Sequence, residues 1–190
     1  SIEEVIERAV RELDLEAKVR LLTGAATFSL HGNDAIGLLP MIFSDGPTGV
    51  RGSEFVGGKR VALFPNATLL AQSWDEMAAQ RVGEMLAAEG RGQGVDVVLG
   101  PTVNLHRSAL GGRLFEAFAE DPLLSGRLAA AYIRGIQRYG VGACVKHYVA
   151  NESETDRHTM NSQVTEAALR ELYLLPFEIA SVLLLVAVVG

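Results

Sequence analysis

Cysteine and long apolar runs are scarce in this sequence, and both absences narrow what the protein can be. Cys144 is the single cysteine among 190 residues, so no disulfide bond can form within the chain. Because Cys144 stands in an apolar segment, we expect a buried structural thiol, which is compatible with a reducing compartment. The run SVLLLVAVVG, residues 181–190, has an uncharged core far shorter than the ~20 residues of a membrane-spanning helix. A buried strand is therefore expected there, and no membrane segment.

Basic residues and metal-binding motifs are also in short supply. Lys and Arg number 17 against 23 Asp and Glu, and the formal net charge of -6 argues against nucleic acid as the main partner. Neither His-x-His nor His-Glu-x-x-His occurs, so we expect no metal and no cofactor. The amino terminus, SIEEVIERAVREL, is charged and amphipathic, unlike a secretory signal. A cytoplasmic location is expected on that basis.

The apolar residues that are present alternate between helical and strand patterns. The pattern predicts helices over residues 2–13, 15–22, 74–88, 123–139 and 165–180, the last interrupted at Pro176, and strands after Pro40, within 94–101, at 141–145 and at 182–189. The strands are apolar without alternation, as expected when both faces of a sheet are covered. Strands that alternate with helices indicate an α/β fold with a parallel sheet, because parallel strands need crossover connections.

Three long polar segments follow the predicted strands, at residues 45–62, 101–121 and 146–164. Loops of this length within a compact domain are commonly functional. Barrels and open sheets of the α/β class place their sites at the carboxyl ends of the strands, where these segments begin. We therefore expect the functional residues in these three loops.

The first two loops carry charged residues that could bind hydroxyl groups. Asp45 begins a Gly-Pro turn, where a purely structural capping role is an equal alternative, and Arg51 follows six residues later. A carboxylate together with a guanidinium group suits vicinal hydroxyls, since sugars offer donors and acceptors together. In the second loop, Gly111 and Gly112 free the backbone before Arg113, whereas surface ion pairs would explain the acidic residues that follow.

Lys146 and His147 open the third loop. Adjacent residues on a regular strand face opposite ways, so both can reach one ligand only where the strand ends or is distorted. A buried Lys146 without a partner would be costly, and it therefore needs a site or a carboxylate such as Glu152 or Asp156. Schiff-base chemistry at Lys146 is conceivable, but no further sequence feature is specific for it.

Five segments, in order, resemble the amino-terminal barrel of glycoside hydrolase family 3, the β-glucosidase family. They are SDGPTGVRG, FPNATLLAQSWD, GPTVNLHRSALGGRLFEAFAEDP, KHYVANESETDRHTMNS and LRELYLLPFEIA. The resemblance implies a partial (β/α)8 TIM-type barrel with mostly parallel strands and helices outside, and residues 1–190 would form an incomplete amino-terminal barrel domain. It also implies a retaining reaction that uses two carboxyl groups, a nucleophile and a general acid/base.

The resemblance further implies which residues bind the substrate, a β-glucoside or short oligosaccharide. The implied sugar-binding residues are Asp45, Arg51, Arg113, Lys146, His147 and Arg157. In this family the residues matching Lys146 and His147 tend to be joined by a cis peptide bond. Glu116 and His158 would lie behind the residues that touch the sugar.

The chain departs from the family pattern after PFEIA. Family members continue through a strand like WAVMAAYN to a segment that bears the nucleophilic Asp, whereas this chain reads SVLLLVAVVG. No catalytic residue is therefore assigned, and this chain by itself is expected to be inactive. A complete barrel typically needs ~250 residues, so the expected partners are the missing barrel half and the carboxyl-terminal domain of a full-length protein.

An incomplete barrel leads to two structural expectations, and two other functions remain as alternatives. Residues 182–189 should form a parallel strand beside the one containing Val145, and an open sheet edge would allow a homo-oligomer. A non-catalytic sugar-binding or assembly module is the first alternative to a β-glucosidase. An unrelated barrel enzyme that uses Lys146 and His147 is the second.

Overall fold

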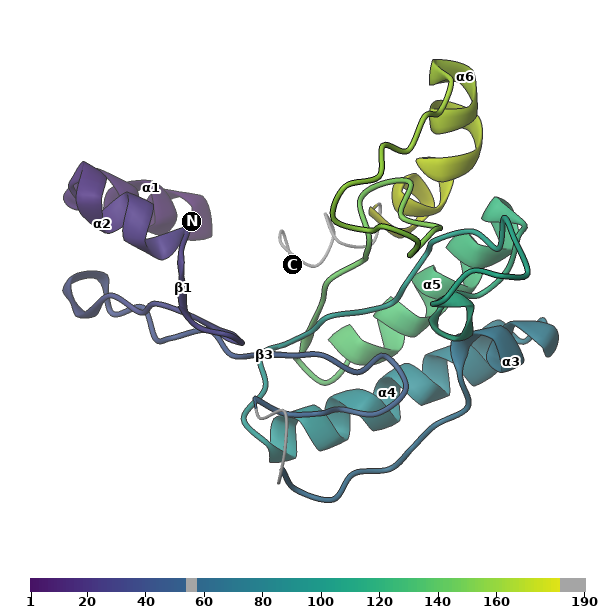
Figure 1. The fold of residues 1–190 in the computed structure, drawn as a ribbon. Coiled ribbons are helices and arrows are strands. Elements are labelled where there is room, and N and C mark those ends of the chain that lie inside the picture. The colour runs from purple at the N-terminus through teal and green to yellow at the C-terminus, as the bar shows by residue number, and fades with distance from the viewer. Residues whose placement is uncertain (54–57, 182–190) are drawn as a thin grey trace.

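Two long helices cover a short parallel sheet in the computed structural model, which describes residues 1–53 and 58–181. The sheet has the order β3-β4-β5, formed by Phe43–Ser44, Val97–Val98 and Gly142–Ala143. Both pairings are parallel, with Phe43 opposite Val97 and Val97 opposite Gly142. Helix α4 (Glu76–Gly92) connects β3 to β4, and helix α5 (Pro122–Gln137) connects β4 to β5. The strands and outer helices form an arc of a (β/α)8-type barrel, as predicted (Figure 1).

The remaining elements are short and lie around this unit. They comprise α1 (Ile2–Glu12), α2 (Leu15–Leu21), an antiparallel pair β1 (Gly24–Ala26) and β2 (Ser29–Leu30), the 3-10 turns η1 (Asp34–Ile36) and η2 (Leu114–Glu116), α3 (Ala67–Gln72), α6 (Glu166–Ala168) and the π-helical turn η3 (Leu169–Tyr173). Residues 175–181 are again helical. No helix in the described part of the chain is long and apolar enough to cross a membrane.

Side chains cap the first turns of α1, α2, α4 and α5 by accepting hydrogen bonds from backbone N–H groups. Ser1 and Glu4 form a capping box at α1, and Asp14 accepts a hydrogen bond from the backbone of α2. Asp75 accepts from the first turn of α4. Asp121 does the same for α5, whose first residue is a proline that has no N–H to leave unpaired.

The core lies between the sheet and the pair α4–α5. Its largest fully buried apolar side chains include Val50, Leu86, Val98, Leu128, Ile133 and Ile136. Glycines let α4 and α5 approach closely, because a Cβ atom on Gly83 would stand 2.2 Å from the Tyr132 carbonyl oxygen. A Cβ atom on Gly135 would stand 2.1 Å from the carbonyl oxygen of Gln80. The helix pair thus packs backbone against backbone at this crossing.

Helices α1 and α2 project away from this core (Figure 1). Neither helix contains a buried residue, although Leu13 between them is buried. Apolar side chains along both helices are exposed: Ile2, Val5, Ile6, Val10, Leu15 and Val19. The predicted spacing of apolar residues is thus confirmed as helix, while the apolar face has no covering element among residues 1–53 and 58–181.

Several sequence-based boundaries and one burial prediction need correction. The helix predicted from Trp74 begins at Glu76, because Trp74 has a left-handed φ of 55° and Asp75 is the cap. The expected break near Pro176 is confirmed, since a bend at residue 174 separates η3 from the helical residues 175–181. The expectation of a buried Cys144 was wrong: Cys144 is exposed, one residue beyond the end of β5. The strand predicted at residues 182–189 lies outside the described residues.

Candidate functional site

The carboxyl ends of the three parallel strands bring the three polar loops together. Asp45 follows β3 directly, and Arg113 lies in the loop after β4. Lys146 follows β5 and pairs with Thr102 in a parallel bridge, with its backbone N–H donating to Pro101 O at 3.0 Å. The peptide bond between Lys146 and His147 is cis, as the resemblance implies. Asp45, Arg113, Lys146 and His147 therefore lie together at one end of the sheet, in three loops far apart in sequence.

Asp45 and Lys146 form the first ion pair of this site. The Lys146 Nζ donates to Asp45 Oδ1 at 3.0 Å, and an Arg51 guanidinium nitrogen lies 4.0 Å from Asp45 Oδ2. Partial burial acts to raise the pKa of Asp45, but the hydrogen bond and charge of Lys146, with help from the Gly46 N–H and Arg51, hold this pKa below its usual value. Asp45 is thus an ionised acceptor, and it is more than a turn cap.

Glu116 is buried and joins the two halves of the site. Its Oε1 accepts a hydrogen bond from Arg113 Nε, and its Oε2 lies 3.3 Å from Thr102 Oγ1 and 3.6 Å from Lys146 Nζ. The carboxylates beside Lys146 are therefore Asp45 and Glu116, which corrects the expectation of Glu152 or Asp156. Burial of Glu116 is tolerated because its charge is paired and hydrogen-bonded.

Each of the three Arg113 nitrogens faces a partner, two through hydrogen bonds and one through an ion pair. Besides Nε, its Nη2 lies 3.1 Å from His147 Nε2, and its Nη1 lies 3.6 Å from Glu154 Oε1, at ion-pair distance. The hydrogen bond and charge of Glu116 outweigh the effect of burial, so the pKa of Arg113 is raised. This arrangement fixes the plane of the guanidinium group, which is the property that selects arginine for oriented hydrogen bonding.

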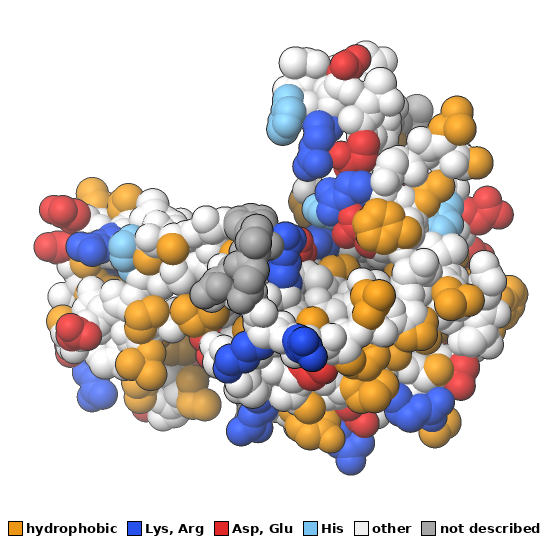
Figure 2. Space-filling view, turned by 60° about the horizontal axis from the view of Figure 1, so that its bottom comes forward, with side chains coloured by type: hydrophobic (Ala, Val, Ile, Leu, Met, Phe, Trp, Pro, Cys, Tyr) orange, Lys and Arg blue, Asp and Glu red, His pale blue; other side chains and the backbone are white. Residues whose placement is uncertain are grey.

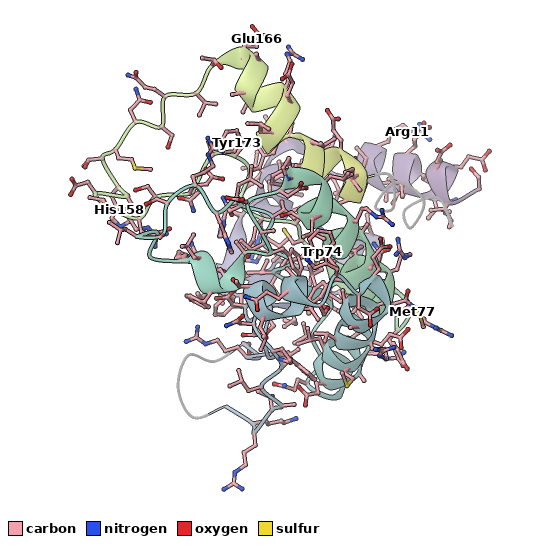
Figure 3. All side chains as sticks on the ribbon, turned by 90° about the vertical axis from the view of Figure 1, so that its right-hand side faces the viewer. Arg11, Trp74, Met77, His158, Glu166 and Tyr173 are labelled. Atoms are coloured by element: carbon pink, nitrogen blue, oxygen red, sulfur yellow. The ribbon has the colours of Figure 1, made fainter. Side chains whose placement is uncertain are left out.

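Arg157 and His158 lie farther out than the residues described so far. An Arg157 guanidinium nitrogen lies 3.0 Å from Glu154 Oε2, and Arg157 reaches the site through this shared carboxylate. Both Arg157 and His158 are exposed, and Figure 3 places His158 on the loop that extends from the body. Glu154 therefore pairs with two arginines, whereas Glu152 accepts hydrogen bonds from Asn104 Nδ2 and the Leu105 N–H.

His147 is half-buried among charged groups. Its Nδ1 lies 2.8 Å from Asn104 Oδ1, an acceptor to which the sequence alone gave no role. Burial and the positive charges of Arg113 and Lys146 lower the pKa of His147 to about 4, against the weaker opposite effect of Glu116 and Glu154. His147 is consequently neutral near pH 7.

The lowered pKa of His147 predicts an acid-sensitive fold. Below pH 6.5, the ordinary pKa of histidine, the unfolded chain takes up a proton at His147. The folded chain takes up this proton only as the pH approaches the lowered pKa of about 4. The free energy of unfolding should therefore fall as pH drops from 6.5 towards 4, and His147→Gln should flatten this dependence. Urea unfolding at a series of pH values measures both proteins; equal slopes for the two in this window would contradict the prediction.

A small cavity opens among these groups. Its lining includes Thr102, Asn104, Arg113, Glu116, His147 and Glu152. Burial raises the pKa of Glu152, against the opposing hydrogen bonds from Leu105 and Asn104. Figure 2 shows acidic and basic side chains gathered beside a recess on one face. Within the described ranges no three His, Cys, Asp or Glu side chains are grouped to hold a metal ion.

Taken together, the outer helices, the parallel strands and a polar site at their carboxyl ends define an α/β barrel domain with an enzyme-type site. A family model described as "Glycosyl hydrolase family 3 N terminal domain" matches residues 13–184. The chain therefore belongs to glycosyl hydrolase family 3, and with it to the glycoside hydrolases. The resemblance seen in the sequence is confirmed.

Curated relatives are named as β-glucosidases. The chain is 52% identical over 175 residues to β-glucosidase B of Emericella nidulans, covering 92% of this chain and 21% of the relative. It is 45% identical to a β-glucosidase of Rhizobium radiobacter, with the same coverage of 92% and 21%. The chain thus spans about a fifth of the length of the curated relatives that it matches.

Solved structures of β-glucosidases share the fold of this chain. The β-glucosidase from Kluyveromyces marxianus in complex with glucose is similar with a TM-score of 0.90 at 39% identity, covering 92% of this chain and 21% of that one. β-Glucosidase 3B from Thermotoga neapolitana in complex with glucose gives a TM-score of 0.86 at 37% identity, covering 93% and 27%. The fold of the described unit is therefore that of the corresponding part of these enzymes.

Proposed function

We propose that this chain forms the glycone-binding part of a retaining β-glucosidase, which hydrolyses O-glycosyl bonds of β-glucosides or short oligosaccharides. The observation that carries the proposal is the convergence of Asp45, Arg113, Lys146 and His147 at the carboxyl ends of β3, β4 and β5. Two solved relatives that share the fold were determined with glucose, which supports a sugar as the ligand.

The chemistry of these groups suits a sugar. Asp45, held ionised, can accept hydrogen bonds from two neighbouring hydroxyls, and hydrogen bonds to a charged group contribute about 1.5–3 kcal/mol each. Lys146 and Arg113 supply donors to the same network, which Glu116 joins. A hydroxyl both donates and accepts, so a ring with several hydroxyls can satisfy both sets of groups at once.

Arg51 and Arg157 are assigned to the rim of the proposed site. The Arg51 side chain is 41% exposed and the Arg157 side chain is 50% exposed, so solvent weakens the contribution of each charge. Both arginines lie beside carboxylates that contact the central cluster, Asp45 and Glu154 respectively. We assign them contacts with the outer hydroxyls of the substrate.

The nucleophile and the acid/base are proposed to come from the remaining barrel half and a carboxyl-terminal domain. The support for this assignment is that the chain spans about a fifth of each curated relative. A non-catalytic sugar-binding module would use the same groups. A Schiff-base enzyme fits less well, because Asp45 and Glu116 lie 3.0 and 3.6 Å from the Lys146 ammonium, whereas that chemistry needs a neutral amine.

Binding of methyl β-D-glucopyranoside tests the proposal. Asp45→Asn keeps the shape of the side chain but removes its charge and one acceptor, and it should weaken binding by about 10–100-fold, the equivalent of one or two charged hydrogen bonds. The measurement is ligand-observed NMR titration of the purified chain. Asp34→Asn, on the exposed turn η1, is the matched control and should leave binding unchanged. Equal binding by the Asp45 variant and the wild type, or no binding by the wild type, would overturn the proposal.

A further inference from the structure

Asn104 contacts His147 at two points. Its Oδ1 lies 3.1 Å from the backbone nitrogen of His147 and 2.8 Å from the ring Nδ1. Asn104 is itself buried and lies in the loop after β4, whereas His147 lies in the loop after β5. One side-chain oxygen therefore fixes both the backbone and the ring of His147.

The orientation of the Asn104 amide follows from its neighbours. A backbone N–H can only donate, so the amide atom that faces the His147 backbone must be the oxygen. On the other side, the Asn104 Nδ2 lies 3.3 Å from Glu152 Oε1, and that carboxylate also accepts from the Leu105 N–H. A flipped amide would place oxygen against carboxylate and NH2 against N–H. Glu152 thus secures the direction in which Asn104 points.

This orientation determines which ring nitrogen of His147 carries hydrogen. The Asn104 oxygen has no hydrogen, so Nδ1 must donate to it. At the other end of the ring, Arg113 Nη2 lies 3.1 Å from His147 Nε2, and a guanidinium group has donors only. Nε2 must therefore keep its lone pair. Both neighbours select the same neutral tautomer, and a second proton would face the Arg113 N–H.

We propose that Asn104 is a positioning residue that holds His147 as the neutral Nδ1–H tautomer, so that its Nε2 accepts a hydrogen bond from Arg113. The third nitrogen of Arg113 is thereby fixed, alongside the two that face Glu116 and Glu154. The consequence for sugar binding rests on the proposed function: a guanidinium held on three sides presents its remaining N–H groups in one direction. The state of the ring itself does not depend on that function.

An exchange of two side chains tests the proposal with little change in net charge. The double variant Asn104→Asp with Glu152→Gln keeps one carboxylate and one amide but exchanges their places, so the carboxylate faces His147. Glu152→Gln alone is the matched control, because it leaves the Asn104 amide against the ring. Nitrogen-15 NMR of the imidazole in the sugar-free chain reports the tautomer and the protonation of His147 directly. The charged groups around the ring, Arg113, Lys146, Glu116 and Glu154, are unchanged in all three proteins.

In the wild type and the control, we expect His147 with hydrogen on Nδ1 and a free lone pair on Nε2. In the double variant, the proton affinity of His147 should rise about tenfold or more, since a carboxylate now faces the Nδ1 hydrogen. Hydrogen on Nε2 in the neutral wild type, or a double variant that titrates like the control, would overturn the proposal. If the double variant does not fold, Asn104→Leu replaces it: Arg113 is then the one remaining neighbour described that selects the tautomer, so a fraction of His147 should carry hydrogen on Nε2. A ring state unchanged from the wild type in this variant would also overturn the proposal.

Sugar titration of the same proteins tests the proposed function separately from the role of Asn104. If the wild type shows the expected tautomer but does not bind methyl β-D-glucopyranoside, the proposed function fails while the role of Asn104 in holding His147 stands. If the wild type binds, the double variant should bind at least about tenfold more weakly at a pH where NMR shows its His147 protonated and that of the control neutral, because Arg113 then loses its neutral acceptor. A double variant that binds as well as the control would contradict positioning of Arg113 through His147.

Discussion

Gly135→Ala is expected to lower the free energy of unfolding by about 2 kcal/mol or more. In a helix interior this change ordinarily favours folding by about 1 kcal/mol, because alanine has the higher helix propensity. Here the new Cβ would stand 2.1 Å from Gln80 O and 2.9 Å from the Glu84 nitrogen, both backbone atoms of α4. Backbone atoms cannot rotate away, so α4 and α5 would have to separate along the core. Overpacking of this kind costs about 3 kcal/mol or more, and the steric term therefore outweighs the propensity term.

Gly92→Ala is the matched control for this prediction. Gly92 ends α4, and a Cβ atom there meets no other atom within 4 Å in the described structure. Its substitution should leave the free energy of unfolding unchanged or raise it by up to about 1 kcal/mol. Urea unfolding followed by circular dichroism measures both variants. Similar midpoints for Gly135→Ala and the wild type would show that the two helices do not pack as closely as described.

The close contact of α4 and α5 is also an example of what the sequence could not predict. Both helices were predicted from their apolar spacing, and α5 begins at Pro122, one residue before the predicted start. Gly83 and Gly135, however, give no local signal, because their role depends on which backbone lies opposite. The same limit applies to Cys144: an apolar neighbourhood in sequence suggested burial, but β5 ends one residue earlier and leaves the side chain exposed.

In the candidate site, too, some residues could be predicted from the sequence, whereas their partners could not. Asp45, Lys146 and His147 were found because they follow predicted strands directly, and parallel strands end at one edge of a sheet. The partners of these residues depend on packing between loops that are far apart in sequence. Glu116 is buried and touches Arg113 and Lys146, in keeping with its expected place behind the sugar-binding residues, but its link between these two could not be predicted. No role was assigned to Asn104 from the sequence, although Asn104 lies only three residues after Pro101, where the strand predicted within residues 94–101 ends.

This 190-residue chain by itself is expected not to hydrolyse a β-glucoside above the background rate. Retaining hydrolysis needs two carboxyl groups about 5–5.5 Å apart on either side of the glycosidic bond, one to attack and one to protonate the departing oxygen. Residues that only bind the sugar leave that chemical barrier in place. Enzymes of this kind owe rate enhancements of at least about a millionfold to the complete arrangement.

The carboxylates described in the site are already engaged. Asp45 pairs with Lys146, and Glu154 pairs with Arg113 and Arg157. Glu116 is buried and accepts a hydrogen bond from Arg113. Glu152 has the raised pKa that suits a general acid, but its Oε1 accepts from Asn104 and Leu105 and faces the protein. We therefore expect none of these four groups to act as the nucleophile.

Release of nitrophenol from 4-nitrophenyl β-D-glucopyranoside measures the activity. The pure chain and its Asp45→Ala variant should give the same rate as buffer, while a complete family 3 β-glucosidase assayed in parallel confirms the substrate. Turnover by the wild-type chain that is lost on Asp45→Ala would show that a nucleophile lies within these residues. Glu152→Gln would then be the first variant to assay, because a carboxyl group with a raised pKa is the best local candidate for the acid that protonates the leaving oxygen.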